Sequence, residues 1–468
     1  MADYYSNKNH NHQDPELLDD DGRPKRTGNV WTASAHIITA VIGAGVLALA
    51  WAVAQLGWIV GPIMMIMFSF ATYYTSTLLA DCYRNGDPLT GTRNYTYVDA
   101  IRSNLGGFNV KLCGFFQYLN LYGLSVGYTI AAASSLVAIQ KGMCLQRRGG
   151  GSDPCNVSNT PLMIGFGVVQ ILLSQIPGLD QIWWLSIIAT IMSFTYSSIG
   201  LILGIAKVAA TGVIKGSLTG VRVGDNGLTM NDKIWQCCQA LGNIAFAYTF
   251  SNILIEIQNT VRSPPSETKT MKKATLIGVS ITSFFYLLTG CFGYAAFGDH
   301  APENLIGDGF LKPYWVIHVA NFAVLIHMFG AYQIYCQPIF FIVEKKMASS
   351  FPKNKFINNE IEIRIPCLMK TSYKLNLFRI VFRTLYVIST TFLAKLIPYF
   401  GSILGLLGAF AYWPLTVYFP IEMYIVHMRV PKWSPKWIGL KVLSAVFLLI
   451  AGAAAAGSIV ILIANFKA

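Results

Sequence analysis

The stretch from Trp31 to Ala80 contains no Asp, Glu, Lys or Arg. Soluble domains carry a charged side chain at about a quarter of their positions, whereas a membrane span needs about 20 consecutive apolar residues. The stretch is therefore long enough to cross a bilayer twice. Because only 12% of the 468 residues are charged and 54% are hydrophobic, the same reasoning extends to the rest of the chain. We expect an all-α polytopic membrane protein.

The same search along the whole chain predicts about eleven transmembrane helices separated by polar loops. The first follows a polar segment, residues 1–30, and lacks the small-residue cleavage site of a secretory signal peptide, so we expect it to be retained. The predicted spans are residues 31–56, 58–81, 112–139, 161–178, 182–206, 234–257, 274–298, 314–343, 376–397, 402–426 and 438–464.

Such a set of spans can be divided into two repeats of five and one extra helix, an organisation that many transporters share. The predicted segments are a mobile cytosolic tail at 1–30, a first five-helix repeat at 31–208, an extracellular loop at 209–232, a second five-helix repeat at 233–428, and an eleventh helix with a short extracellular C-terminus at 429–468.

The formal net charge of +13 does not indicate a nucleic-acid partner, because the basic residues form no patch interleaved with aromatic side chains. Most of the 35 Lys and Arg residues instead fall in segments that share one side of the membrane with the N-terminus. Positive loops face the cytosol. The sequence therefore predicts a protein embedded in a lipid bilayer, with a cytosolic N-terminus and an extracellular C-terminus.

Two cysteines, Cys144 and Cys155, share one predicted outward loop. An oxidising exterior allows them to form a disulfide, and the alternative is two unpaired thiols. The same loop carries an acceptor sequence for N-glycosylation at Asn156. A second acceptor sequence, at Asn94, lies in an inward loop and is expected to stay bare.

Spans one and six occupy matching positions in the two repeats, and both show signs of an interrupted helix. Gly43 and Gly45 lie near the middle of span one, where each lowers helix stability by about 1 kcal/mol relative to alanine. Close packing of helices is the alternative explanation for these glycines. In span six, polar side chains gather between Asn243 and Asn252. Two weakened helices at matching positions predict a binding site near the bilayer midplane.

Several long motifs resemble those of the plant amino acid permeases, members of the amino acid/auxin permease family. The motifs are HIITAVIGAGVLALAWAVAQLGW from His36, TYYTSTLLADCYR from Thr72, TGTRNYTY from Thr90, ILIEIQNTVRSPPSE from Ile253, GAYQIYCQP from Gly330 and WPLTVYFPIEM from Trp413. The resemblance spans nearly the whole chain after residue 30. It implies a LeuT-type inverted repeat of five plus five helices with one extra helix, and proton-driven amino-acid uptake across the plasma membrane.

The resemblance also implies which residues bind the amino acid. Its carboxylate would meet the backbone of span one, its ammonium group would meet span six, and span three would form a wall. The residues so implied are Ile42, Gly43, Ala44, Gly45, Val46, Gln117, Tyr118, Asn120, Tyr122, Ala245, Phe246, Ala247, Tyr248 and Ser251. The chain departs from the family pattern at Asn259 and His318, where acidic residues are usual, which bears on substrate charge preference and on coupling.

Ionisable side chains within spans are costly and are candidates for carrying the coupled proton. His36 precedes the glycines of span one, Glu256 follows the polar cluster of span six, and His327 lies in span eight. Each has an alternative: a neutral, hydrogen-bonded histidine, or for Glu256 an ion pair with Arg262 or Lys272. The stretch from Pro313 to Val343 contains no Ser or Thr, which favours protons over sodium as the coupling ion.

Enzyme function has no support, because the sequence lacks a phosphate-binding loop, a nucleophile elbow and a zinc-type spacing of Cys or His. We therefore predict no cofactor and no metal site. A channel would need a continuous polar lining, whereas the polar residues here are clustered. An amino-acid receptor built on a transporter fold, and a carrier of another organic acid such as auxin, stay open. No feature indicates an oligomeric state.

Overall fold

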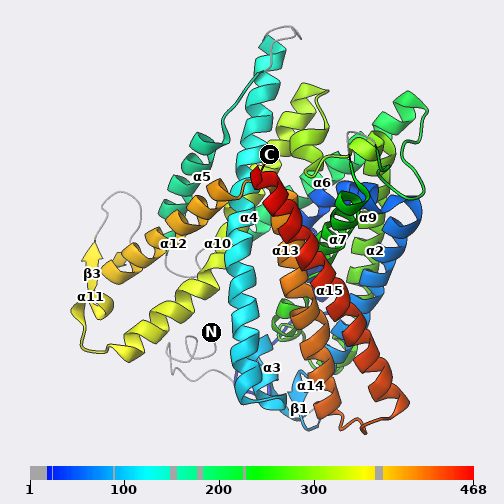
Figure 1. Ribbon diagram of the computed structural model, residues 1–468. Helices are drawn as coiled ribbons and strands as arrows, with labels where there is room; N and C mark the ends of the chain where they lie inside the picture. Colours follow the sequence, from blue (N-terminus) through cyan, green and yellow to red (C-terminus); the bar gives the residue numbers. More distant parts are fainter. Residues whose placement is uncertain are drawn as a thin grey trace.

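The computed structural model describes residues 18–23, 25–87, 90–147, 155–176, 183–224, 228–363 and 373–467. Its described parts are mostly helical (Figure 1), which confirms the predicted helical membrane fold. The membrane helices are α1 (Val30–Val41) with η3 (Ala44–Ala48), α2 (Leu49–Asp81), α4 (Gly107–Arg147), α5 (Asn159–Ser174), α6 (Trp183–Thr211), α7 (Met230–Ala247) with η6 (Ser251–Ile253) and α8 (Leu254–Gln258), α9 (Glu267–Phe297), α10 (Tyr314–Ser350), α12 (Leu377–Leu396), α13 (Phe400–Ala411) with η9 (Tyr412–Tyr418) and α14 (Phe419–His427), and α15 (Pro435–Lys467).

The connections hold only short elements. The segment Tyr97–Asn104 forms α3, close to the start of α4 in the chain. The remaining elements are α11 (Lys355–Asn358), η7 (Gly298–His300), η8 (Leu305–Gly309) and two antiparallel hairpins, β1 (Arg84–Asn85) with β2 (Thr92–Arg93) and β3 (Glu360–Ile363) with β4 (Tyr373–Asn376).

Within the described residues, nine helices are long and apolar enough to cross a membrane, and α1 and α5 are shorter apolar helices. One of the nine, Ala44–Asp81, contains a turn. Gly57 has φ 80°, a conformation that favours glycine. A Cβ built at Gly61 would lie 3.1 Å from the Val53 side chain, so the chain turns back on itself there. This turn separates spans one and two, which agrees with about eleven crossings.

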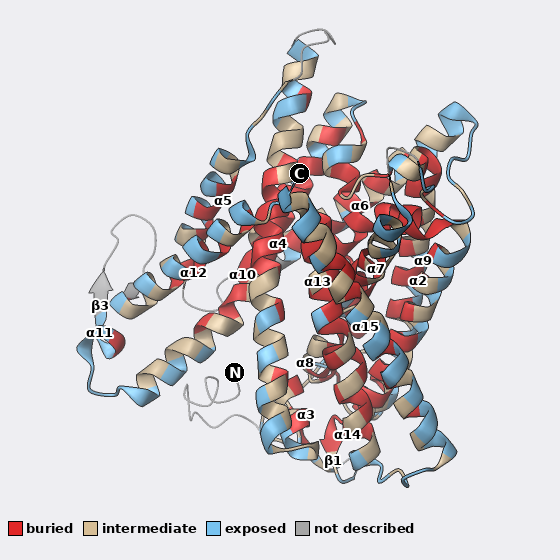
Figure 2. Cartoon of the chain, in the orientation of Figure 1, coloured by how far each residue is buried: buried red, intermediate tan, exposed pale blue. Residues whose placement is uncertain are grey.

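The helices form two groups by their contacts. The first group consists of α1, α2, α7, α8 and α9, which pack against one another. In the second group, α4 contacts α5, α10 and α12. Helix α13 touches both groups, through α7 and through α4. Figure 2 shows buried residues concentrated where the central helices meet, and outer helices with exposed faces. Exposed apolar side chains such as Phe392 and Leu449 are suited to contact lipid.

Cys144 and Cys155 form a disulfide, as predicted. This bond ties the end of α4 to the segment before α5, at the top of Figure 1. The nearby Asn156 is exposed, and its glycosylation stays a prediction. In contrast, the Asn94 side chain is buried and donates a hydrogen bond to the carbonyl of Cys82 at 2.9 Å. The structure therefore gives a second reason for Asn94 to stay bare.

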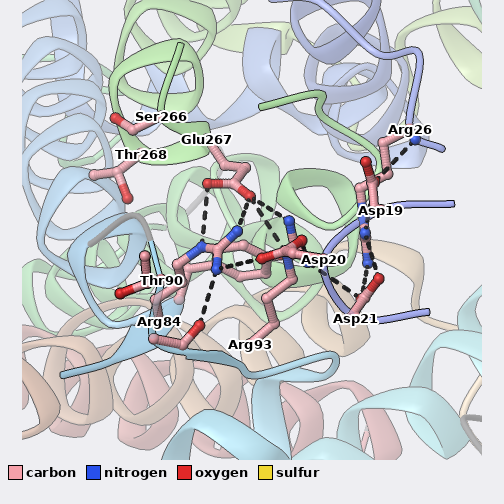
Figure 3. A network of polar contacts seen from close by, with 12 residues as sticks. Asp19, Asp20, Asp21, Arg26, Arg84, Thr90, Arg93, Ser266, Glu267 and Thr268 are labelled. Carbon is pink, nitrogen blue, oxygen red and sulfur yellow. Dashed lines mark hydrogen bonds and ion pairs between the residues drawn. The ribbon is translucent and has the colours of Figure 1, made fainter. Parts of the chain in front are cut away.

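The described part of the N-terminal segment differs from the mobile tail expected at 1–30. Residues 18–23 and 25–29 lie against the loops that follow α2 and α8, held by charged side chains (Figure 3). Sequence composition alone cannot reveal this docking, because the arginines that pair with Asp19, Asp20 and Asp21 mostly lie far along the chain. Residues 1–17 and 24 lie outside the described part. The face that holds this segment is termed the N-terminal side below.

Candidate functional site

The helix of span one is interrupted where the sequence predicts it. Helix α1 ends at Val41, Ile42 has an extended conformation with ψ 95°, and η3 begins after Gly43. The hydroxyl of Tyr286 donates a hydrogen bond to the carbonyl of Val41, which no longer has a helical partner. Because η3 continues directly into α2, the first amides of this second half-helix lie at the interruption.

The interruption of span six follows Ala247 and lies within the polar stretch between Asn243 and Asn252. Ala245, Phe246 and Ala247 still belong to α7, and the non-helical residues are 248–250, before η6 and α8. Tyr248 keeps a hydrogen bond from its amide to the carbonyl of Ile244 at 3.3 Å, so the helix loosens only from this residue on. The carbonyl groups freed by the interruption are therefore those at the C-terminal end of α7.

The two interrupted helices touch at Gly45. A Cβ built on Gly45 would lie 2.8 Å from the Cα of Ala247 and 3.3 Å from Cδ1 of Phe246. Only glycine allows the backbones to approach this closely without a shift. The contact brings the start of one half-helix next to the end of another.

A cavity of about 280 Å³ lies beside this contact, near the lower end of the range for small-molecule sites. Its walls come from α1, η3, α4, α6, α7 with the segment that follows it, and α10. The lining residues are His36, Thr39, Ala40, Val41, Gly43, Ala44, Gly45, Asn120, Leu124, Tyr128, Ala189, Thr190, Phe246, Ala247, Thr249, Asn252, Ile253, Ile257, His327, Ala331, Ile334 and Tyr335.

Some of the residues implied by the resemblance line this cavity and some do not. Those in the lining are Gly43, Ala44, Gly45, Asn120, Phe246 and Ala247. Those outside it are Ile42, Val46, Gln117, Tyr118, Tyr122, Ala245, Tyr248 and Ser251.

Three of the residues outside the lining have other partners. Tyr122 donates a hydrogen bond to Ser389 on α12 at 3.0 Å. The ring of Tyr248 packs against Tyr286, with centroids 5.6 Å apart. The hydroxyl of Ser251 lies 3.2 Å from that of Ser76. These side chains support the walls and do not face the cavity.

The described lining contains no Asp, Glu, Lys or Arg. Its polar groups are hydroxyls, the amides of Asn120 and Asn252, and two imidazoles. Any charge on a ligand would therefore be met by backbone groups, helix ends and neutral side chains.

His327 is buried at the junction of the two helix groups. Its Nδ1 lies 2.8 Å from the carbonyl oxygen of Ala189, and since a carbonyl only accepts, Nδ1 carries the hydrogen. Its Nε2 is the nearest atom to a Cβ built on Gly43, at 4.0 Å. This nitrogen therefore faces the interruption in span one with an open position for a proton.

The other two candidates for proton binding lie in different surroundings. His36 lines the cavity from α1 and is exposed. Glu256 is outside the lining, and its Oε1 accepts a hydrogen bond from the amide of Tyr97 at 3.2 Å. Its suggested ion pair with Lys272 is wrong, because that ammonium group pairs with Asp81 at 2.7 Å. Among the described residues, no ion pair joins Glu256 to Arg262 either.

Sequence reasoning placed His327 of α10 at the site but missed the other lining residues of α10 and those of α6. Ala331, Ile334 and Tyr335 belong to the motif GAYQIYCQP, one of the motifs that carry the resemblance. Its length and its place in span eight were the available signal. Ala189 and Thr190 carry no such signal, because an alanine and a threonine in an apolar helix are ordinary.

Comparisons with known proteins show the family to which the chain belongs. The family model described as "Transmembrane amino acid transporter protein" matches residues 26–464. The chain belongs to this family. It is a membrane transporter and not an enzyme. Within the family, it is 58% identical to "Amino acid permease 3" of Arabidopsis thaliana over 453 residues, which cover 97% of this chain and 94% of the relative.

Two further relatives show how far the similarity extends. "Amino acid permease 4" of Arabidopsis thaliana is 59% identical over 445 residues, with 95% of each chain covered. "Lysine histidine transporter-like 6" of the same plant is 26% identical over 439 residues, covering 92% of this chain and 90% of the relative.

Among solved structures, "Inward facing conformation of Mhp1" aligns with a TM-score of 0.49 and 13% identity, covering 96% of this chain and 94% of that chain.

Proposed function

We propose that the protein imports amino acids across the plasma membrane by proton-coupled symport, with neutral or broad substrate preference. The observation that carries this proposal is the cavity between two interrupted helices, lined by no charged side chain other than histidine within the described residues. The family supplies the transported class, and the names of the permeases above agree with it.

The two helix ends at the cavity suit a zwitterion, because one favours negative charge and the other favours positive charge. The carboxylate would lie at the amides of Ala44 and Gly45, where a half-helix begins and favours negative charge. The ammonium group would lie toward the carbonyls at the end of α7, close by because Gly45 touches Ala247. Asn120 and Tyr335 would contact the side chain or the backbone of the substrate.

We infer that the N-terminal side faces the cytosol. The basic residues of the loops on that side support this orientation, and the Cys144–Cys155 disulfide suits an oxidising exterior for the opposite side. Asn156 would then be available for glycosylation. The cavity is lined by α1 and by Ile253 and Ile257, which belong to the half-helices on the N-terminal side. The conformation would then be one that opens toward the cytosol.

Alternating access would follow from motion of the first helix group against the second. Spans one, two, six and seven pack together, as do the helices around α4. The cavity lies between the two groups, so a rocking motion would expose it to either side in turn.

The coupled proton would bind at the cavity, and we propose His327 as its carrier. An imidazole titrates near neutral pH, and Nε2 faces Gly43 beside the expected carboxylate position. A bound carboxylate favours a protonated imidazole, so that the substrate and the proton would each strengthen binding of the other. The absence of Ser and Thr between Pro313 and Val343 argues against a hydroxyl-based sodium site.

Uptake into proteoliposomes tests the substrate class. We expect radiolabelled neutral amino acids to accumulate, and a tenfold excess of unlabelled neutral amino acid to compete better than an equal excess of lysine. A protein that binds amino acids but moves none into the vesicles would instead be a receptor.

The loop between α9 and α10 contains a carboxyl group, Glu303, that we expect to respond to external pH. In this loop, Glu303 accepts a hydrogen bond from the amide of Gly401, at the start of α13, at 3.0 Å. Partial burial, together with the charge of Asp308, raises the pKa of Glu303 above its ordinary value of 4.5. Since the pKa is raised only while the loop is packed, protonation favours the packed state. That stability is fully present below pH 4.5 and is lost as pH rises through the raised pKa.

Glu303→Gln mimics the protonated carboxyl. This variant should keep the loop packed at neutral as well as at acidic external pH. If the packed loop favours uptake, the ratio of uptake at acidic to neutral external pH should fall about twofold toward one. Asp232→Asn is the matched control, because Asp232 also accepts a backbone amide at a helix start but is exposed. An unchanged ratio in Glu303→Gln would contradict the prediction.

A further inference from the structure

The docked N-terminal segment joins four spans at one face of the molecule. Gly28 pairs with the strand-like segment after α8: its amide donates to the carbonyl of Thr260 at 3.0 Å, and its carbonyl accepts from the amide of Arg262 at 2.9 Å. Arg26 donates to the carbonyl and to the side chain of Asn259, at 2.7 and 2.9 Å. The start of span one is thereby attached to the end of span six.

The same segment also reaches spans two and seven (Figure 3). Asp20 pairs with Arg84 at 3.1 Å and with Arg93, both on the hairpin after span two. These two arginines share one carboxylate, that of Glu267, at 2.6 and 3.0 Å; Glu267 is the first residue of α9, the helix that contains span seven. Nearby, Lys272 of α9 pairs with Asp81 of α2 at 2.7 Å.

Charge balance explains why the acidic residues are needed. Arg84, Arg93 and Glu267 are each 3% exposed or less, whereas Asp20 is 50% exposed at the rim. Without the carboxylates of the N-terminal segment, the guanidinium groups of Arg84 and Arg93 would share only the carboxylate of Glu267. Leaving a buried charge uncompensated is strongly unfavourable. Asp20 therefore completes a cluster that would otherwise repel itself.

The cluster is not a pH switch. Partial burial alone would raise the pKa of Asp20, but hydrogen bonds from Arg93 and Arg84 hold that pKa below its usual value. The guanidinium groups of Arg26, Arg84 and Arg93 have raised pKa values, after the opposing effect of burial, because of their carboxylate partners. Asp20, Arg26, Arg84 and Arg93 therefore stay charged at any cytosolic pH.

We propose that this cluster is a permanent clamp, made of Asp19, Asp20, Asp21, Arg26, Arg84, Arg93, Asn259 and Glu267, that fastens spans one, two, six and seven into one moving body. All of its members come from segments adjoining these four spans, which are the helices that pack together in the membrane. Within the described residues, the ion pairs of this cluster join none of α4, α5, α10 and α12. A gate would instead connect the two helix groups and break in each cycle. The clamp stays closed while α1 moves with its group.

A covalent replacement of one ion pair separates a clamp from a gate. The variant Asp20→Cys with Arg93→Cys removes the contact, and a short bismaleimide can then restore it. The assay is counterflow of a radiolabelled neutral amino acid in proteoliposomes, with reagent applied to the detergent-solubilised protein before reconstitution. This test rests on the proposed function, because counterflow requires amino-acid transport. Counterflow needs no net proton movement, so it would still be measurable if the protein did not couple transport to protons.

We expect counterflow in the double variant to fall at least about fivefold and to recover to at least half of the wild-type rate after cross-linking. Asp20→Asn, which changes a half-exposed side chain and should fold, should give a loss of about threefold. Cross-linking that abolishes the residual counterflow would show a gate and overturn the proposal. Wild-type counterflow in both variants without reagent would also overturn it.

Matched controls exclude other causes. Asp99 and Arg102 form an exposed pair on α3, with side chains 32% and 62% exposed. Asp99→Cys with Arg102→Cys should transport normally with and without the reagent. Each single cysteine variant of Asp20 and Arg93, treated in the same way, accounts for reaction with native thiols such as Cys237 and Cys291.

Discussion

Gly45→Val should reduce amino-acid uptake at least about tenfold while the protein still reaches the cell surface. A Cβ at this position would lie 2.8 Å from the Cα of Ala247 and 3.0 Å from its Cβ. The obstacle is backbone, which cannot rotate away, so the two interrupted helices must separate. Overpacking of this kind costs about 1–3 kcal/mol, and ~1.4 kcal/mol corresponds to tenfold in an equilibrium. Uptake normalised to surface protein measures the effect.

Gly439→Val is the control for the glycine substitution. Gly439 lies on α15, and a Cβ built there meets nothing within 4 Å. This variant should keep uptake close to wild type. If Gly45→Val also transports normally, the close contact between spans one and six is not needed, and the assigned site is wrong.

His327→Gln should remove at least about nine tenths of the acid-stimulated current that a neutral amino acid evokes, and should keep amino-acid counterflow. The glutamine amide can still donate to the carbonyl of Ala189, which the imidazole contacts at 2.8 Å, but it has no nitrogen that titrates. Exchange without net proton movement would continue. A structural role alone predicts that current and counterflow fall together.

His427→Gln serves as the control for the histidine substitution. His427 lies on α14 outside the cavity, and its Nδ1 is 3.2 Å from the side-chain oxygen of Asn104. Its replacement should leave the pH response of the current unchanged. A His327→Gln protein with a normal acid-stimulated current would move the coupling role to His36 or Glu256.

The membrane fold could be predicted because its cause is local in sequence. Long apolar helices follow from composition alone, and the interruption at Gly43 follows from two glycines in one turn of helix. The Cys144–Cys155 disulfide was also predictable, because both residues share a short loop. These features need no knowledge of which helices are neighbours.

The cavity lining was predicted only in part, because it depends on helix rotation. Asn120 faces the cavity while Tyr122, two residues later on α4, contacts Ser389 on another helix. Tyr335 enters the lining from span eight, in which only His327 was predicted as a site residue. Such details follow from packing between distant segments.

The N-terminal segment illustrates the same limit for charges. A run of three aspartates followed by basic residues suggests a solvated tail. Its docking depends on Arg84, Arg93 and Asn259, which only the folded chain brings together. A charge cluster built from separate segments therefore cannot be predicted from the sequence of any one segment.

Proton-coupled import is tested most directly by the current that an amino acid evokes in a voltage-clamped cell expressing the protein. The recording compares acidic with neutral external pH, and sodium with an inert cation, for one neutral amino acid. The proposed function predicts an inward current that grows at acidic pH and is the same in both cations. A current that requires sodium, or uptake of labelled amino acid with no current at any pH, would contradict proton symport.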